Sequence, residues 1–302
     1  MPTVTIATRK SALALAQARA WMQDFSSASG WQTEELHVVT TGDKIQDRAL
    51  NLIGGKGLFI KEIEEAIIEG RAQAAVHSLK DVPAELVAEL TLGCIPPRED
   101  PRDVVVTRTG CHFTELPAGA NVGTSSLRRK YQLQKVRPDL NYEPIRGNVD
   151  TRLRKCEEGI VDAVILAASG MHRLGLKSRY THALEPEMCL PAIGQGALAI
   201  ELREDNAELA QALRSVHCEK TARIVAAERG VMLAVDGSCQ VPVAGFGVRE
   251  QEGEDTLWLR GMLAEADGSN MQFRERRFPW PQNDKAAFDA GMSLGKELKA
   301  TR

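Results

Sequence analysis

The chain has 302 residues, of which 43% are hydrophobic and 26% are charged, and its formal net charge is −3. This composition is typical of a globular protein and excludes a disordered or fibrous chain, while the charge disfavours a generally basic nucleic-acid binder. The length predicts two or three domains, since one domain usually takes ~150 residues. No apolar run approaches the ~20 residues of a membrane span, and residues 1–6 lack the pattern of a signal peptide, so we expect a cytoplasmic protein.

The first third of the chain alternates between strand and helix patterns. We expect strands at 4–8, 36–40 and 74–77, a helix from about 12 to 26 with Ser11 as its N-cap, and a helix over 57–69. Prolines at 96, 97 and 101 then predict a linker near 96–101.

A second alternating block follows this linker. It predicts strands at 103–107, 121–123 and 163–168 and helices over 126–136 and 149–158. Repeated β-α-β signals indicate parallel or mixed sheets flanked by helices. The stretch 191–196 (PAIGQG) fits either a second linker or an ordinary tight turn.

The last third has a different character. A helical pattern over 218–235 precedes strands at 243–248, 257–263 and 271–277 and an amphipathic helix over about 284–299. Three strands and a closing helix predict a small α+β domain.

Basic residues are concentrated in the middle of the chain. Residues 124–179 contain twelve basic and six acidic side chains, so this segment carries +6 in a chain that is acidic overall. Within it, two glycine turns precede helix starts that carry arginines, the first with Arg128 and Arg129 and the second with Arg152, and Arg146 directly precedes the second glycine. Helix starts and bidentate guanidinium groups both favour anions. The plainer interpretation is a pair of capped helices with solvated arginines.

The segment His77–Pro83 follows the third predicted strand, where ligands usually bind in α/β sheets. A carboxylate at this position, Asp81, could stabilise a developing cation. The alternative is an aspartate that caps a turn before Pro83. We expect His77 to be a packed strand residue rather than a ligand.

The chain has six cysteines, at 94, 111, 156, 189, 218 and 239, and their spacing matches no zinc motif. In the cytoplasm they would be reduced. Cys239 lies in a predicted loop between Gly237 and Pro242, where a thiol can be exposed, although most cysteines are small buried hydrophobes. The glycine-rich segment Gly54–Phe59 lacks the spacing of a nucleotide-binding phosphate loop.

Eight short segments of the chain, taken in order over about residues 4–245, resemble the motifs of the porphobilinogen deaminase family. They are Ile6–Ser11, Gly54–Phe59, His77–Pro83, Arg98–Asp103, Gly123–Arg129, Arg146–Val149, Gly194–Ala197 and Cys239–Pro242. The resemblance depends on their order together, since each motif alone is modest.

The resemblance implies an α/β protein with two domains like those of periplasmic binding proteins, joined by two hinge segments, and a small C-terminal α+β domain. The expected boundaries are 1–97 with 196–216 for the first domain, 101–192 for the second, and 217–302 for the third. The family joins four porphobilinogen molecules head to tail into the linear tetrapyrrole hydroxymethylbilane and releases ammonia. Its dipyrromethane cofactor would be attached by a thioether to Cys239.

In this resemblance Asp81 matches the catalytic aspartate, which would stabilise the azafulvenium-like cation left by loss of ammonia. Arginines matched to groups that hold acetate and propionate side chains are Arg9, Arg128, Arg129, Arg146, Arg152 and Arg173. Residues matched to further hydrogen-bonding contacts are Ser11, Gln17, Ser78, Lys80, Thr124, Ser125, Ser126 and Gln195. Thr41 stands where some relatives carry arginine, so one basic contact could be absent.

Two other functions also fit parts of the pattern. A non-catalytic two-lobed binding protein for a small dicarboxylate fits the predicted architecture, but gives Cys239 no special role. A cysteine-nucleophile hydrolase needs a histidine base, and no motif places one beside Cys239. The partner we expect is a small-molecule substrate, with no nucleic acid, membrane or metal, and the chain is expected to be a monomer.

Overall fold

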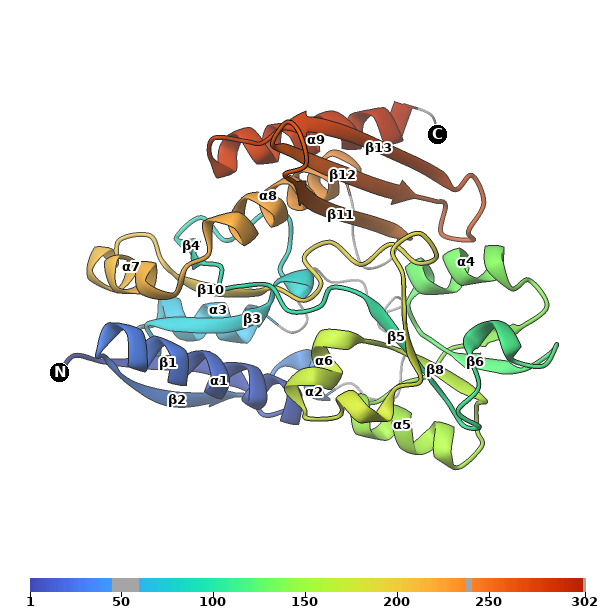
Figure 1. Cartoon of the computed structure of the whole chain (residues 1–302). Coiled ribbons are helices and arrows are strands. Elements are labelled where there is room, and N and C mark those ends of the chain that lie inside the picture. Colours follow the sequence, from blue (N-terminus) through green and yellow to red (C-terminus); the bar gives the residue numbers. More distant parts are fainter. Residues whose placement is uncertain (45–59, 237–240, 301–302) are drawn as a thin grey trace.

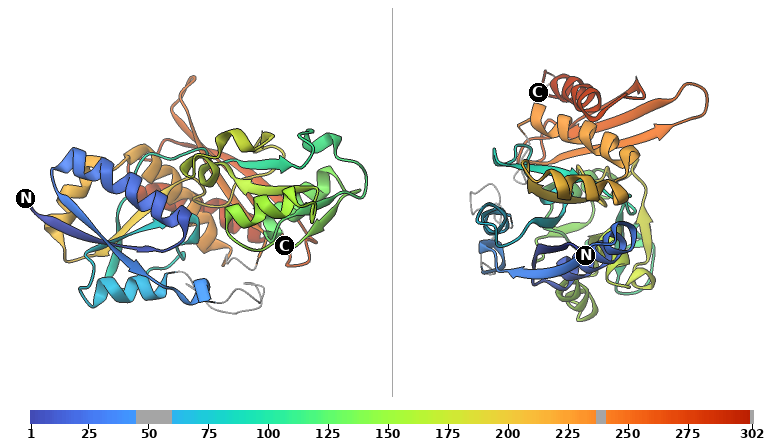
Figure 2. Two further views of the ribbon diagram at one scale, coloured as in Figure 1. Left: turned by 90° about the horizontal axis from the view of Figure 1, so that it is seen from below. Right: turned by 90° about the vertical axis from the view of Figure 1, so that its left-hand side faces the viewer.

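The computed structural model describes residues 1–44, 60–236 and 241–300 of the chain, and Figure 1 shows the arrangement of their helices and strands. Two five-stranded sheets lie side by side, and a three-stranded sheet with two long helices lies over both (Figures 1 and 2). This is the mixed α/β architecture with a small third α+β unit that the sequence predicted.

The first sheet has the strand order β2-β1-β3-β10-β4. Its strands are β1 (Thr3–Arg9), β2 (Gln32–Val38), β3 (Ala74–Ser78), β4 (Leu90–Cys94) and β10 (Leu198–Arg203). Its helices are α1 (Ala12–Ser29), α2 (Thr41–Lys44), α3 (Lys61–Ile68) and α7 (Ala207–Leu213), with short 3-10 turns η2 (Leu79–Asp81) and η5 (Arg214–Val216). Strand β10 is antiparallel to both of its neighbours. It follows the strands of the second sheet in the sequence, so the chain returns to the first sheet after building the second one.

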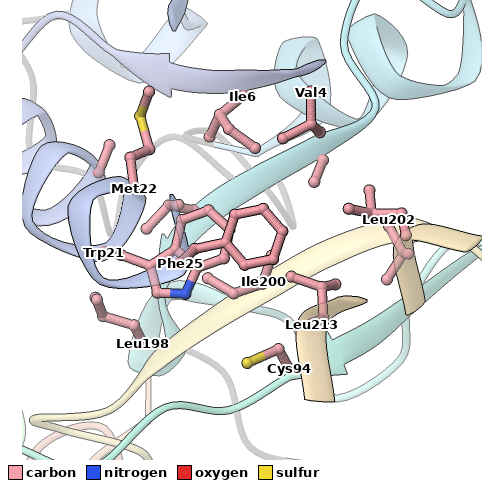
Figure 3. Close-up of a cluster of buried hydrophobic side chains, with 14 residues drawn as sticks. Val4, Ile6, Trp21, Met22, Phe25, Cys94, Leu198, Ile200, Leu202 and Leu213 are labelled. Carbon is pink, nitrogen blue, oxygen red and sulfur yellow. The ribbon is translucent and has the colours of Figure 1, made fainter. Parts of the chain in front are cut away.

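Helix α1 illustrates how the sequence builds this unit. Ser11 caps its start by accepting the Ala14 N–H, and Gly30 ends it with φ of 74°, a backbone conformation that glycine adopts freely. Between these ends, Trp21 and Phe25 point into a buried apolar cluster with β1 and β10 (Figure 3). The helical spacing of apolar residues in this part of the sequence therefore corresponds to a buried core.

The second sheet has the strand order β7-β6-β8-β5-β9. Its strands are β5 (Asp103–Thr107), β6 (Asn121–Gly123), β7 (Asn141–Glu143), β8 (Ala163–Ala167) and β9 (His182–Leu184). Its helical segments are α4 (Leu127–Val136), α5 (Val149–Glu157), α6 (Ala168–Arg173), η3 (Phe113–Glu115) and η4 (Lys177–Arg179). The starts of α4 and α5 are capped by Ser126 and Asn148, so both arginine-bearing helices begin where the glycine turns predicted.

The third unit is an antiparallel sheet whose strands follow in chain order. It contains β11 (Val243–Glu250), β12 (Thr256–Leu263) and β13 (Gln272–Pro279), with α8 (Glu219–Ala234) and α9 (Asp284–Ala300). Helices α8 and α9 approach each other closely through glycines, of which Gly291 faces the backbone of Ala227. This unit agrees with the predicted three strands and closing helix.

Several elements differ from the sequence-based expectations. The strand expected at 36–40 runs from Gln32 to Val38, because it pairs along all of β1 and tolerates polar residues at the sheet edge. Strands β4, β7, β9 and β10 were not predicted; three of them have five residues or fewer, too short for a clear period. The domain boundaries given above remain a prediction. No helix in the described parts of the chain is long and apolar enough to cross a membrane.

The close approach of α8 and α9 predicts that Gly291→Ala destabilises the fold. An added Cβ would overlap the carbonyl oxygen of Ala227, so the free energy of unfolding should fall by about 1–3 kcal/mol. This would occur even though alanine favours an isolated helix by roughly 1 kcal/mol over glycine. Urea denaturation would measure the change, with Lys296→Ala on the exposed side of α9 as the control, expected within about 0.5 kcal/mol of the unmodified protein. A Gly291→Ala protein as stable as the control would contradict the packing.

Candidate active site

The catalytic candidate Asp81 lies just beyond the carboxyl end of β3, which points toward the centre of the molecule (Figure 1). The turn η2 is anchored by its first residue: Leu79 is buried, and its N–H donates to the carbonyl of Ala197 (3.0 Å). Asp81, at the other end of the turn, is exposed and lines a pocket of about 30 Å³. The fold therefore holds this carboxylate beyond the carboxyl end of the central strand of the first sheet, on a turn whose backbone is hydrogen-bonded to the rest of the unit.

Three other predicted site residues line the same pocket: Arg9, Gln17 and Ser78. Gln17 and Ser78 exchange hydrogen bonds, with Nε2 to Oγ at 3.0 Å and Oγ to Oε1 at 3.2 Å. The Arg9 guanidinium forms an ion pair with Asp43. Burial acts to raise the pKa of Asp43, but hydrogen bonds from Arg9 and neighbouring groups outweigh it and lower that pKa. The structure thus brings together four of the predicted residues, one of them already ion-paired.

The predicted hydroxyl groups are engaged mainly with nearby backbone. Ser11 and Ser126 cap α1 and α4 by accepting N–H groups of the first turns. Ser125 Oγ donates to a backbone carbonyl (2.6 Å), and buried Thr124 accepts the Ser126 N–H (3.2 Å). These residues therefore shape the helix starts, which leaves the first N–H groups of α4 as the anion-favouring feature.

A buried carboxylate, Asp103, holds two predicted site arginines. Its Oδ2 accepts from Arg128 Nη1 (2.8 Å), and its Oδ1 accepts from Arg129 Nη2 (2.7 Å) and Gln195 Nε2 (2.9 Å). Burial acts to raise the pKa of Asp103, but the two guanidinium charges outweigh it and hold that pKa far below its usual range. Arg128 and Arg129 are only 6% and 7% exposed. Both were expected to bind ligand carboxylates, and in this structure each already binds an internal one.

Lys80 connects the first sheet to this cluster. Burial lowers the pKa of its ammonium group, and the charge of Asp81 opposes that effect. The charges of Arg129 and Arg128 lower the same pKa further, while Asp103 raises it. Lys80 is therefore within electrostatic reach of both the candidate catalytic carboxylate and the paired arginines, so the two sheets present their charged groups to one region.

Three further predicted arginines are only partly exposed and are not ion-paired within residues 1–44, 60–236 and 241–300. Burial lowers the pKa of Arg152 to about 10, and the charges of Arg129 and Arg146 contribute. Burial likewise lowers the pKa of Arg173. Arg152 and Arg173 each donate to one backbone carbonyl, at 2.9 and 2.8 Å. Crowded, partly desolvated guanidinium groups of this kind favour a polyanionic ligand.

Two segments connect the first and second sheets, and they run beside each other. The Glu99 N–H donates to the carbonyl of Gly196 (3.2 Å), and Gln195 Nε2 donates to the carbonyl of Pro101 (2.7 Å). These contacts lie in the two stretches predicted as linkers. For the second stretch, where the sequence left a linker and a tight turn open, the structure has both, since a turn at its end joins the two sheets.

The same connection is fixed to the third unit by Glu228, which is fully buried in α8. Its oxygens accept from Arg98 Nη1 (2.6 Å) and Nη2 (3.1 Å) and from the N–H groups of Gly194 (2.8 Å) and Gly247 (2.9 Å). One carboxylate thereby joins both connecting segments to α8 and β11.

The predicted cofactor cysteine, Cys239, and the segment Gly54–Phe59 lie outside the described residues. The five cysteines within them are free thiols. Burial raises the pKa of Cys94 and Cys189 to about 12 and that of Cys156 to about 11. These three are therefore poor nucleophiles at neutral pH.

Sequence reasoning missed the acidic partners of the basic residues. Asp103 was treated as the start of a strand and the end of the Arg98–Asp103 motif, without a role of its own, and Asp43 was given no role. Glu228 lies in a helical pattern that carries no signal of its role. His77 is buried as expected, with Nε2 at 3.0 Å from Oε2 of buried Glu201. An acidic residue inside an apolar strand, as in 198–202, is the signal that could have revealed this pair.

Comparisons with known proteins agree with these observations. A family model described as the porphobilinogen deaminase dipyromethane cofactor binding domain matches residues 4–211, and one for the porphobilinogen deaminase C-terminal domain matches residues 222–300. A porphobilinogen deaminase of Sorangium cellulosum is 56% identical over 301 residues, which cover 99% of each chain. One of Bacillus subtilis is 47% identical over 270 residues, which cover 89% of this chain and 85% of the relative.

Among solved structures, the methionine-binding protein MetQ superposes with a TM-score of 0.45 and 12% identity, over 75% of this chain and 94% of that one. This is a likeness of fold alone. The alternative function as a non-catalytic binding protein has no further support from the comparisons.

The buried cluster predicts that Asp103→Asn strongly destabilises the protein. Removing this charge leaves two buried guanidinium groups without their counter-ion, so the free energy of unfolding should fall by about 3–5 kcal/mol in urea denaturation. Asp139→Asn is the matched control, because Asp139 also pairs with an arginine (Arg137, 2.6 Å) but is exposed to solvent. Its effect should be much smaller. Similar losses in the two variants would show that burial does not set the strength of the Asp103 cluster.

Proposed function

This chain belongs to the porphobilinogen deaminase family, and from that premise we propose how its own residues carry out the reaction. The protein is a transferase that condenses porphobilinogen molecules stepwise, head to tail, into the linear tetrapyrrole hydroxymethylbilane of haem biosynthesis and releases ammonia. The observation that carries the assignment of roles is that Asp81, at the end of β3, lines one pocket with three other predicted site residues, Arg9, Gln17 and Ser78.

The residues around this region suit a dipyrromethane group, whose side chains are carboxylates. Arg152 and Arg173 have lowered pKa values from burial and no acidic ion-pair partner within the described chain, so a polycarboxylate would relieve their crowding. Gln195 Oε1 is also buried and accepts no hydrogen bond from a described residue, which leaves an acceptor for an N–H group. When bound, the group supplies the pyrrole carbon to which the chain is extended.

We assign the covalent attachment of this group, through a thioether, to Cys239. The support is the family match together with the chemistry of the other thiols. Cys94, Cys156 and Cys189 are buried and have raised pKa values, which makes them unsuitable for attachment.

Asp81 is assigned the stabilisation of positive charge on the substrate. Loss of ammonia from the aminomethyl group of porphobilinogen leaves a cationic pyrrole, and a carboxylate on a fixed turn lowers the energy of that charge. The exposed position of Asp81 lets it meet a substrate.

The basic residues are assigned to the acetate and propionate groups of substrate and cofactor. Arg146, Arg152 and Arg173 have guanidinium groups with few protein partners and would bind carboxylates directly, with Lys80 beside Asp81. Arg128 and Arg129 retain N–H donors beyond those given to Asp103, and they keep the potential of the region positive. Arg9, at the end of β1, would bind such a carboxylate from the side of the first sheet.

The polar residues would contribute hydrogen bonds around these charges. Gln17 and Ser78 line the Asp81 pocket, and Ser11 lies at the start of α1 beside it. Thr124, Ser125 and Ser126 lie where α4 begins.

We propose that the enzyme acts as a monomer in the cytoplasm, with porphobilinogen as its partner molecule and without nucleic acid or membrane. The five free thiols of the described chain fit a reducing compartment.

Asp81→Asn is expected to lower kcat by about 10²–10⁴-fold while leaving cofactor content and folding unchanged, because only the charge that stabilises the cation is removed. Single-turnover and steady-state assays of ammonia release would measure it. Glu85→Gln, an exposed carboxylate a few residues later, is the control and should retain full turnover. Turnover by Asp81→Asn within a few-fold of the control would remove the assigned role.

Cys239→Ser is expected to yield a folded protein that carries no covalent pyrrole group and has no activity. Intact-protein mass spectrometry would show an added mass equal to two linked pyrrole units in the unmodified chain, and peptide digestion would place it. Cys111→Ser, which changes a partly exposed thiol elsewhere in the chain, should keep that mass. An adduct that persists in Cys239→Ser would place the attachment elsewhere.

A further inference from the structure

Arg229 lies in α8 of the third unit, and its guanidinium group bonds the chain directly after Asp81. Its Nη1 donates to the carbonyl of Val82 (3.4 Å), and its Nη2 donates to the carbonyls of Pro83 (2.8 Å) and Ala84 (3.1 Å). Arg229 is only 9% exposed, and it forms no ion pair with an acidic residue of the described chain. The donors of this buried cation are therefore given to three consecutive backbone carbonyls.

A buried guanidinium group without a carboxylate partner is costly to desolvate. Burial lowers the pKa of Arg229 to about 10, and the charge of Glu201 opposes that effect, so the group is still charged at neutral pH. A charged donor makes stronger hydrogen bonds than a neutral one, and the planar guanidinium group fixes the directions of several acceptors at once. These contacts therefore restrain the peptide groups that follow Asp81.

The turn that carries Asp81 is held at its other end by the first unit. The Leu79 N–H donates to the carbonyl of Ala197 (3.0 Å), and the Val82 N–H closes the turn on the carbonyl of Leu79 (3.0 Å). Val82 is extended, with φ of −79° and ψ of 125°, as expected for a residue before a proline. Asp81 thus lies between two anchored positions, one held by the first unit and one by α8.

The same helix leads to the residue that we assign to cofactor attachment. Cys239 follows the C-terminal end of α8 in the sequence. Buried Leu79 and Val82 share one apolar cluster with Ala222 and Val225 of α8, so the turn packs on the helix besides being bonded to it. A displacement of α8 would therefore act directly on the turn of Asp81.

From these contacts we infer that Arg229 is a positioning residue for the proposed reaction, which holds the Asp81 carboxylate in a fixed place relative to the helix that leads to Cys239. The inference rests on the roles proposed above for Asp81 and Cys239. A displacement of about 1 Å at a reacting group can lower a rate by roughly 10²-fold. Loss of the guanidinium group should therefore slow the condensation step and leave substrate binding nearly unchanged.

Arg229→Met removes all three contacts and keeps an unbranched side chain. In the holoenzyme, kcat with porphobilinogen should fall about 10–100-fold, while KM stays within about twofold and the mass of the attached cofactor is unchanged. Arg229→Lys keeps the charge but replaces the planar group with a single donor atom, so its kcat should lie between those of Arg229→Met and the unmodified protein.

Arg137→Met is the matched control. Arg137 also donates to three backbone carbonyls, those of Phe113, Thr114 and Leu116, but it does so in the second unit, away from Asp81. This variant should lower the stability of the fold without lowering kcat.

A double-mutant cycle separates an effect on Asp81 from a general effect on the fold. In the Asp81→Asn protein, adding Arg229→Met should change the single-turnover rate by less than about threefold, because the charge that Arg229 positions is already absent. An equal fall in both backgrounds, or a kcat of Arg229→Met equal to that of Arg137→Met, would overturn the inference. If Arg229→Met does not fold, Arg229→Lys in the same two backgrounds gives the same comparison. Near-normal turnover by Asp81→Asn alone would instead contradict the role of Asp81 itself, and the inference with it.

Discussion

The carboxylate of Asp103 is the constraint on which the charged centre of the molecule depends. It begins β5, is fully buried, and has guanidinium groups of Arg128 and Arg129 on its two oxygens. Neither the anion nor the cations could be buried alone, because desolvation of an unpaired charge costs several kcal/mol. Since Gln195 from the second connecting segment donates to the same carboxylate, α4, β5 and the connection to the first sheet are held in one arrangement.

The other basic residues of this region are not paired in this way. While Arg128 and Arg129 pair with Asp103, Arg146, Arg152 and Arg173 have no acidic ion-pair partner in the described residues. Partial burial lowers the pKa of Arg152 and Arg173, so a carboxylate ligand beside them would stabilise their charged form. Lys80, next to Asp81 on the first sheet, is within electrostatic reach of Arg128 and Arg129 on the second. In the proposed mechanism, the first sheet therefore supplies the acid and the second sheet most of the basic groups.

The third unit is tied to the same centre by a second buried carboxylate. Glu228 of α8 binds Arg98 and the N–H groups of Gly194 and Gly247, so the helix that precedes the Cys239 segment is fixed to both connections. The same helix packs closely against α9 through glycines.

The sequence by itself determined the class of fold, most helices and longer strands, and the identity of the charged residues, because amphipathic periods, caps such as Ser11 and Ser126, and motif order are local properties of the chain. It also indicated the +6 central segment and placed Asp81 at a strand end. Only the tertiary structure decided which arginines are engaged by internal carboxylates, since the partners of Arg9, Arg98 and Arg129 lie far from them in sequence or carry no distinguishing pattern. The short strands β7 and β9 and the returning strand β10 were likewise settled by pairing with neighbours, because hydrogen bonds between distant segments leave little trace in a local period.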